Sequence, residues 1–183
     1  MKTFIKKYKN QLIITSIITL IYLIYMLICK IHPFGEHTLF RSDVKGQYFE
    51  YWIYMKNVFF RKDNFIYSFS KSIGGNMFGI WSYYLLSPYN LLFLISKPES
   101  YIDIFTFMTY LKILSASLAF YTFSKYKTNN NSIKILCSIA YGLMGYVVSY
   151  QMNIMWLDGV ILLPIISIGV IKIIKENKFN TYI

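Results

Sequence analysis

Charged residues are scarce in this sequence. Only 15% of its 183 residues are Asp, Glu, Lys or Arg, whereas 56% are hydrophobic and 20% are aromatic. A soluble domain usually carries about 25% charged residues, so this chain has too few charges to cover a soluble surface of its size. The composition therefore predicts a membrane protein.

Cysteine pairs and the common nucleotide and nucleophile motifs are also lacking. The two cysteines, Cys29 and Cys137, both lie inside apolar stretches, which argues against a disulfide framework and a zinc site. The sequence contains neither GxxxxGKS/T nor GxSxG, the motifs of phosphate loops and of nucleophile elbows. The turn Gly74-Gly75-Asn76 lacks the spacing of a phosphate loop and is interpreted as a plain turn.

Acidic residues are few, and the charge balance is strongly basic. The chain has 19 Lys and Arg against 8 Asp and Glu, a net charge of +11. The positive charges are scattered between apolar stretches and do not form the continuous stripe that is typical of nucleic-acid binding. We therefore expect membrane lipids with anionic headgroups, and no nucleic acid, as partners.

Four apolar stretches are long enough to cross a bilayer, which takes about 20 helical residues. The predicted spans are residues 11–29, without charge; 104–124, interrupted only by Lys112; about 135–153, within the uncharged stretch 135–156; and about 159–174, directly after Asp158. The first stretch is longer than the usual ~7–15 residues of a signal peptide core and has no small-x-small cleavage site after it, so an uncleaved anchor is predicted. The fold class is all-α polytopic membrane protein.

Residues 82–96 are ambiguous because they are short and contain Pro88, which breaks helical hydrogen bonding. If they do not cross the bilayer, three basic clusters fall on one side, as the positive-inside rule requires. The clusters are Lys2/Lys6/Lys7/Lys9, Lys125/Lys127/Lys134 and Lys172/Lys175/Lys178. We therefore expect residues 82–96 to form a re-entrant or interfacial pair of short helices, the N-terminus to be cytoplasmic, and residues 30 to about 103 to form one long extracytoplasmic loop.

Within this loop, residues 44–60 have a helical pattern. The apolar residues Tyr48, Trp52, Met55 and Phe59 recur at helical spacing, and either Ser42 or Asp43 is a suitable N-cap. An aromatic-rich helix of this type is predicted to lie in the headgroup layer.

Asp43 is the candidate catalytic residue of the loop. It stands between Arg41 and Lys45, a short distance after the first span. A carboxylate at the outer membrane face can accept a proton from a hydroxyl as a general base, while neighbouring cations hold an anionic phosphate. The alternative is that Asp43 is only a helix N-cap, in which case its lone pairs are used by backbone N–H groups.

Other polar residues are weaker candidates. His32, Glu36 and His37, with Asp43, are ligand types that suit a divalent cation, but solvated loop residues are the better interpretation and no metal ligand is assigned. Lys112 lies in the middle of a span, where an ammonium costs about 2.5–3.5 kcal/mol, so it needs a polar cavity or a partner. Asp158 is either a residue of the membrane interface or part of a substrate site with Asp43.

The order of four motifs is the most specific signal. RSDVKGQYFEYW is followed by YSFSKSIGGNMFGIWSYYLLSPYNLL, by LKILSASLAFYTF and by AYGLMGYVVSYQMNIMWLDGVILLPIISIGVIKII. This order and spacing resembles the amino-terminal part of the YfhO family of bacterial membrane proteins, over roughly residues 10–178.

The resemblance implies a C-type (GT-C) glycosyltransferase, a polytopic helical protein that uses lipid-phosphate-linked sugars outside the membrane. The implied reaction moves a sugar from undecaprenyl phosphate to a cell-envelope acceptor, such as teichoic or lipoteichoic acid in a Gram-positive bacterium. Asp43 matches the acidic residue of the family's first outer loop, and Arg41, Lys45, Lys112 and Asp158 are candidate substrate-binding residues.

The sequence departs from the pattern of this family in two respects. Many C-type enzymes have a paired acidic motif, whereas Asp43 stands alone, which weakens the case for metal dependence. A divalent cation is kept as a candidate cofactor without an assigned site. Family members are much longer, so the chain is expected to be an amino-terminal portion of a larger domain.

The competing class is a non-enzymatic membrane protein, either a transporter subunit or an envelope assembly factor. Transporters place polar residues along several spans, and here only Lys112 clearly does so.

Overall fold

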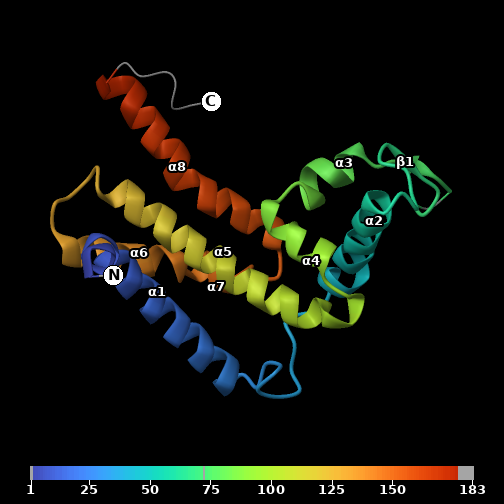
Figure 1. The fold of residues 1–183 in the computed structure, drawn as a ribbon, viewed down its shortest axis with the longest axis horizontal. Helices are drawn as coiled ribbons and strands as arrows, with labels where there is room; N and C mark the ends of the chain where they lie inside the picture. Colours follow the sequence, from blue (N-terminus) through green and yellow to red (C-terminus); the bar gives the residue numbers. More distant parts are fainter. Residues whose placement is uncertain (1, 72, 177–183) are drawn as a thin grey trace. The chain divides into compact units, whose positions relative to one another are not determined.

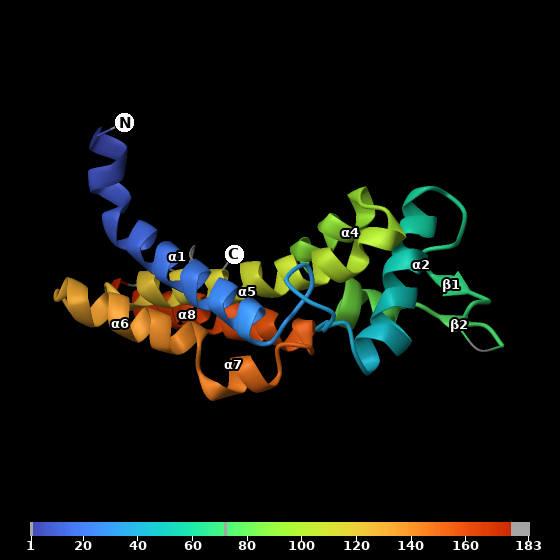
Figure 2. The same ribbon diagram turned by 90° about the horizontal axis from the view of Figure 1, so that it is seen from below.

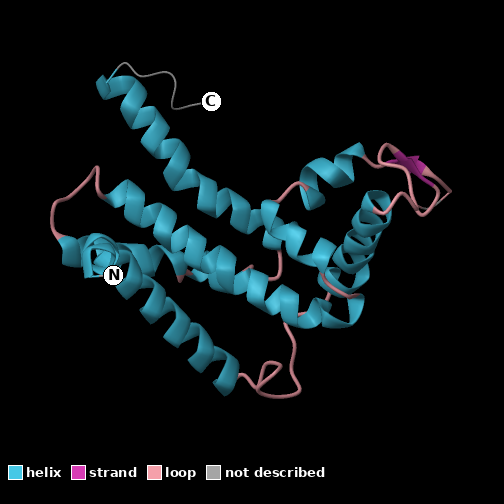
Figure 3. Ribbon diagram, in the orientation of Figure 1, coloured by secondary structure: helices cyan, strands magenta, loops and turns pink. Residues whose placement is uncertain are grey.

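The structure is a computed structural model that describes residues 2–71 and 73–176. Within these residues it is helical except for loops and one pair of two-residue strands (Figures 1 and 3). The all-α fold class is therefore confirmed. Lys178, a member of the third basic cluster, lies outside the described residues. The chain divides into two compact units: unit 1 comprises Met1–Lys30 and Thr109–Ile183, and unit 2 comprises Ile31–Met108.

Unit 1 is built from spanning helices. They are α1 (Lys2–Ile28), the larger part of α5 (Tyr101–Ser124), α6 (Asn131–Gly142), α7 (Gly145–Ser149) and α8 (Ile154–Glu176). Four segments of the described chain are long and apolar enough to cross a membrane, namely Lys6–Ile28, Pro98–Ser124, Asn131–Ser149 and Ile154–Lys175. Apolar side chains such as Leu20 and Ile28 point outward, as they do on surfaces that face lipid. The four predicted spans all correspond to these segments.

Two local details of unit 1 differ from the predicted segments. The third stretch is not one helix, because the chain leaves helical geometry at Leu143 and Met144 between α6 and α7. The fourth helix begins at Ile154, before the predicted residue 159, so Asp158 lies on α8 and not ahead of it. A charge near a helix end lowers the local hydropathy without interrupting the helix, which explains the late predicted start.

Helices α1 and α5 run antiparallel. Asn10, near the start of α1, donates to the Tyr121 hydroxyl near the end of α5 at 3.0 Å, and the hydroxyls of Thr19 and Tyr110 lie 2.7 Å apart further along. The chain therefore leaves α1 and enters the unit 1 part of α5 at the same end of this unit. The prediction that residues 82–96 do not cross the bilayer requires this arrangement, because the chain then returns to the membrane on the side where it left α1.

The basic residues gather at the other end of unit 1. The start of α1, the end of α5 and the end of α8 lie at the same side of this unit in both views (Figures 1 and 2). These ends carry Lys6, Lys7 and Lys9, then Lys125 and Lys127, and finally Lys172 and Lys175. The positive-inside rule predicts that these basic residues lie on one side of the membrane.

Unit 2 is built from short helices around aromatic side chains. Its elements are the π-helical turn η1 (Val44–Tyr48), α2 (Phe49–Phe59), strands β1 (Tyr67–Ser68) and β2 (Gly75–Asn76), α3 (Phe78–Ile80), the π-helical turn η2 (Trp81–Leu85), the 3₁₀ turn η3 (Pro88–Asn90), α4 (Leu91–Ile95), the 3₁₀ turn η4 (Pro98–Ser100) and the start of α5. The strands pair antiparallel, with Tyr67 opposite Asn76. The segments Phe78–Leu85 and Pro88–Ile95 meet at 90°, so the predicted pair of short helices is present and breaks at the proline.

Trp52 organises the core of unit 2. Its ring stacks on Phe93 with centroids 3.7 Å apart, and its indole N–H donates to the Asn90 side chain at 3.1 Å. The Asn90 amide in turn donates to the carbonyls of Tyr84 and Leu85. The helix predicted from Tyr48, Trp52 and Met55 therefore exists, and these three side chains are buried; Phe59 is exposed.

Candidate functional site

Asp43 lies at the entrance of η1 with an exposed side chain. It occupies the N-cap position, but its carboxylate makes no capping hydrogen bond. The alternative that Asp43 serves as a side-chain N-cap is therefore wrong. No ion pair involving Asp43 is recorded within residues 2–71 and 73–176, so the carboxylate is available to solvent or to a ligand.

Ser42, directly before Asp43, has an unusual backbone conformation. Its φ of 49° lies in the left-handed region, which is uncommon for a residue with a side chain. Its carbonyl accepts from the N–H groups of Lys45 and Gly46, both at 3.1 Å. Ser42 is therefore the backbone reversal that starts the helical segment. Backbone strain of this kind tends to cluster at functional sites.

A cluster of four tyrosines lies beside Asp43. Tyr84 is at the centre, with its ring centroid 5.5 Å from that of Tyr48, 4.9 Å from Tyr51 and 4.8 Å from Tyr83. Burial, the neighbouring Tyr84 and the Asp43 carboxylate raise the pKa of Tyr48 well above its ordinary value. Tyr48 therefore stays protonated at physiological pH. Burial is the main cause of this pKa shift, and the Asp43 carboxylate adds to it.

The two cations that flank Asp43 are exposed. The Arg41 guanidinium lies 3.5 Å from the His37 ring nitrogen, and neither Arg41 nor Lys45 forms an ion pair with Asp43 in the described part of the chain. Cations that are not neutralised by a nearby carboxylate suit an anionic ligand. The arrangement therefore offers a carboxylate and two cations on one short, exposed segment.

The four possible metal ligands are not gathered into a site. Across the ranges that the structure describes, no group of three or more His, Cys, Asp and Glu side chains is placed to hold a metal ion. His32 instead pairs with Asp103 at 2.5 Å, His37 faces Arg41, and Glu36 is exposed.

Lys112 has the partner that its position in a span requires. The ammonium is 1% exposed as a residue and lies 2.8 Å from the Asp158 carboxylate. It also donates to the Ile154 carbonyl at 2.8 Å, one helical turn before Asp158. The lysine of α5 and the first turns of α8 are thus joined by a buried ion pair. Both charges were recognised as candidates from the sequence because each interrupts an apolar stretch, but their ion pair was not predicted.

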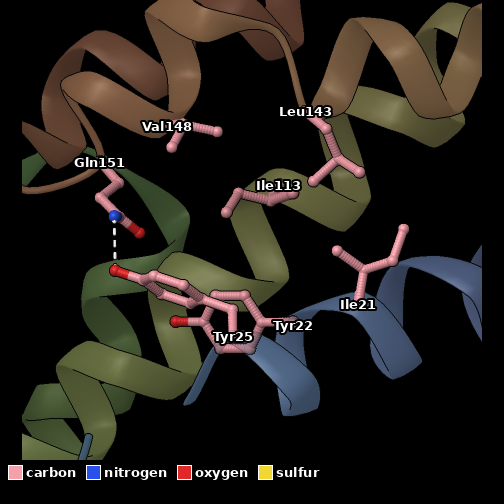
Figure 4. Close-up of a pocket in the computed structure, with 7 residues that line it drawn as sticks. All are labelled: Ile21, Tyr22, Tyr25, Ile113, Leu143, Val148 and Gln151. Carbon is pink, nitrogen blue, oxygen red and sulfur yellow. Dashed lines mark hydrogen bonds between the residues drawn. The ribbon is translucent and has the colours of Figure 1, made fainter. Parts of the chain in front are cut away.

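An apolar pocket of unit 1 was not predicted from the sequence. It has a volume of about 200 Å³ and is lined from α1, α5 and the α6–α7 region, with Ile21, Ile113, Leu143 and Val148 among its residues (Figure 4). At one side the Gln151 amide donates to the Tyr25 hydroxyl at 2.9 Å.

Asp43, Arg41 and Lys45 belong to unit 2, whereas Lys112 and Asp158 belong to unit 1. The first three residues thus share one segment of unit 2, and the last two form an ion pair within unit 1. A common site for Asp43 and Asp158 stays a prediction.

These features define a polytopic helical membrane protein with an exposed carboxylate between two cations in its loop unit. The family model "Bacterial membrane protein YfhO" matches residues 12–183, and the chain belongs to this family. No curated protein and no solved structure gives a significant match to the chain.

Proposed function

We propose that the protein transfers a sugar from a polyprenyl-phosphate donor to a cell-envelope acceptor of the teichoic or lipoteichoic acid type. The observation that carries the proposal is the Asp43 carboxylate, which is exposed, makes no capping hydrogen bond and stands between two cations. Membership of a bacterial membrane protein family is compatible with this activity. The apolar spans give such a protein access to a lipid-linked donor.

Asp43 acts as the general base in the proposed reaction. The acceptor hydroxyl oxygen forms a bond to the anomeric carbon of the donor sugar, and its proton passes to the Asp43 carboxylate. The bond between the anomeric carbon and the phosphate oxygen breaks, and its electron pair stays on the phosphate. The products are the glycosylated acceptor and polyprenyl phosphate.

Arg41 and Lys45 stabilise the negative charge of the departing phosphate. A hydrogen bond to a charged group contributes about 1.5–3 kcal/mol. Loss of such a contact therefore weakens donor use by about 10- to 100-fold. Lys112 and Asp158, which form an ion pair within unit 1, have no assigned step in this reaction.

Replacement of Arg41 and Lys45 by Gln tests the proposed phosphate contacts. We expect each variant to lower kcat/KM for a polyprenyl-phosphate sugar by about 10- to 100-fold, because the phosphate loses a charge-assisted partner. Lys62→Gln, an exposed lysine elsewhere in unit 2, is the matched control and should retain wild-type transfer. If the two variants match the control, Arg41 and Lys45 do not contact the donor phosphate.

The proposed orientation places the basic end of unit 1 in the cytoplasm and unit 2 outside. We expect a cysteine at Asn129 to be shielded from an impermeant thiol reagent in intact cells, and a cysteine at Lys62 to be labelled. The reason is that the positive-inside rule places the basic loop between α5 and α6 in the cytoplasm. Both substitutions are made in a Cys29→Ser/Cys137→Ser background, since both native thiols are exposed. Labelling at position 129 with protection at position 62 would reverse the orientation and place Asp43 on the wrong side for this chemistry.

A further inference from the structure

Unit 2 contains a second pocket that the proposed reaction has not used. It has a volume of about 440 Å³, within the range of about 300–1,000 Å³ that is typical of small-molecule sites. One wall is α2, which contributes Glu50, Tyr51, Tyr54 and Asn57, and the other includes Asp63, Lys71 and Met77. The pocket thus combines aromatic rings with carboxylate, amide and ammonium groups.

Several wall residues form hydrogen bonds with other residues of unit 2. The Tyr54 hydroxyl donates to the Asn64 carbonyl at 2.7 Å and lies 3.3 Å from the Trp81 indole nitrogen. The Asp63 carboxylate accepts from the Asn64 N–H at 2.7 Å and from the Ser68 hydroxyl at 3.0 Å. Lys71 donates to the Asn76 carbonyl at 2.9 Å, which uses one of its three protons. These contacts fix the frame of the pocket.

Glu50 and Asn57 are two polar side chains of the pocket that these contacts leave for a ligand, beside Ser70 and the two remaining protons of Lys71. They are seven positions apart on α2 and lie on the same helix face, about two turns from each other. No hydrogen bond or ion pair of either side chain is recorded in the described ranges. A carboxylate accepts two or more hydroxyl protons, and an amide both donates and accepts.

This chemistry fits a neutral, polyhydroxylated ring. Vicinal hydroxyls match the carboxylate and amide, and the C–H face of a ring packs on an aromatic side chain such as Tyr51. A free phosphate is disfavoured because the pocket has two carboxylates, Glu50 and Asp63, against one lysine. We infer that this pocket binds a neutral sugar ring.

One residue of the pocket also belongs to the tyrosine cluster near Asp43. Tyr51 lines the pocket and also contacts Tyr84, the central ring of the tyrosine cluster beside Asp43. A sugar held by Glu50 and Asn57 therefore lies within the same unit as Asp43, on the helix that follows it. A role of this pocket in the reaction rests on the proposed function, that is, on sugar transfer by the protein. The sugar belongs either to the donor lipid or to the acceptor.

The test measures binding of methyl glucoside, methyl galactoside and methyl N-acetylglucosaminide to the complete purified protein in detergent by calorimetry. We expect saturable binding of at least one of them, and Glu50→Ala and Asn57→Ala each to weaken it by about 10- to 100-fold. Glu99→Ala, an exposed acid outside the pocket, is the matched control and should bind as the wild type does. Absence of saturable binding for all three glycosides, or equal binding by the pocket variants and the control, overturns the inference.

Transfer kinetics then separate this inference from the proposed function. If Glu50→Ala raises KM for the lipid donor alone, the pocket holds the donor sugar; if it raises KM for the acceptor alone, the pocket holds the acceptor. Glycoside binding that the pocket variants abolish supports the sugar site even where the protein transfers no sugar, in which case only the proposed function fails. Transfer with unchanged KM values in both pocket variants supports the function and overturns the sugar site.

Discussion

Lys112→Met is expected to destabilise the protein by about 3 kcal/mol. Removal of one partner from a buried ion pair costs about 3–5 kcal/mol because the other charge is left unpaired. The lower end applies here because the Asp158 side chain is 26% exposed and water can reach part of its carboxylate. Thermal unfolding of the purified protein in detergent measures the change as a lower midpoint temperature.

A double variant separates loss of the pair from loss of the lysine itself. Lys112→Met/Asp158→Leu removes both charges, and replacement of a buried pair by apolar residues is often neutral or stabilising, so most of the lost stability should return. Lys175→Met, an exposed lysine at the end of α8, is the matched control and should unfold as the wild type does. A stable but inactive double variant assigns the pair a role in substrate binding, whereas a single variant as stable as the control means that the pair contributes no stability.

Asp43→Asn is expected to lower the rate of sugar transfer by about 10²–10⁴-fold, the usual contribution of a general base. The substitution keeps the size of the side chain and removes its basicity. Stability should not change, because the carboxylate makes no capping hydrogen bond that could be lost. Single-turnover transfer from a polyprenyl-phosphate sugar measures the chemical step.

The control for this variant is Glu99→Gln, an exposed acid on η4 that should retain wild-type transfer. Near-wild-type transfer by Asp43→Asn would remove Asp43 as the base and direct the search to Asp158 or Glu36. A loss of transfer together with a lower unfolding temperature would instead indicate a structural role for the carboxylate.

The spans could be predicted from the sequence because length and apolarity alone specify a helix that crosses a bilayer. The 90° bend after η2 could also be anticipated, since Pro88 cannot continue the preceding helical hydrogen bonds. The interruption between α6 and α7 was missed because residues 143 and 144 are Leu and Met, neither of which breaks a helix by its own preference. The flanking residues Gly142 and Gly145 were the sequence signal for the break, because Gly is unfavourable inside a helix.

The candidate site was predictable as a set of residues but not as an arrangement. Periodicity placed Asp43 before a helix, yet the left-handed Ser42 and the absence of a capping hydrogen bond follow from the backbone path. Lys112 and Asp158 are far apart in the sequence, and only the packing of α5 against α8 pairs them. The second pocket of unit 2 depends in the same way on the placement of Asp63, Lys71 and Met77 opposite α2.

Donor turnover by the complete protein is the direct test of sugar transfer. The purified protein is reconstituted in vesicles with a radiolabelled polyprenyl-phosphate sugar and a teichoic-acid-type acceptor, and the lipid and acceptor fractions are separated over time. We expect label to move to the acceptor in step with release of polyprenyl phosphate, and Asp43→Asn to slow this movement at least 100-fold. Label that stays on the lipid, with folded wild-type protein and both substrates present, would mean that the protein does not transfer this sugar.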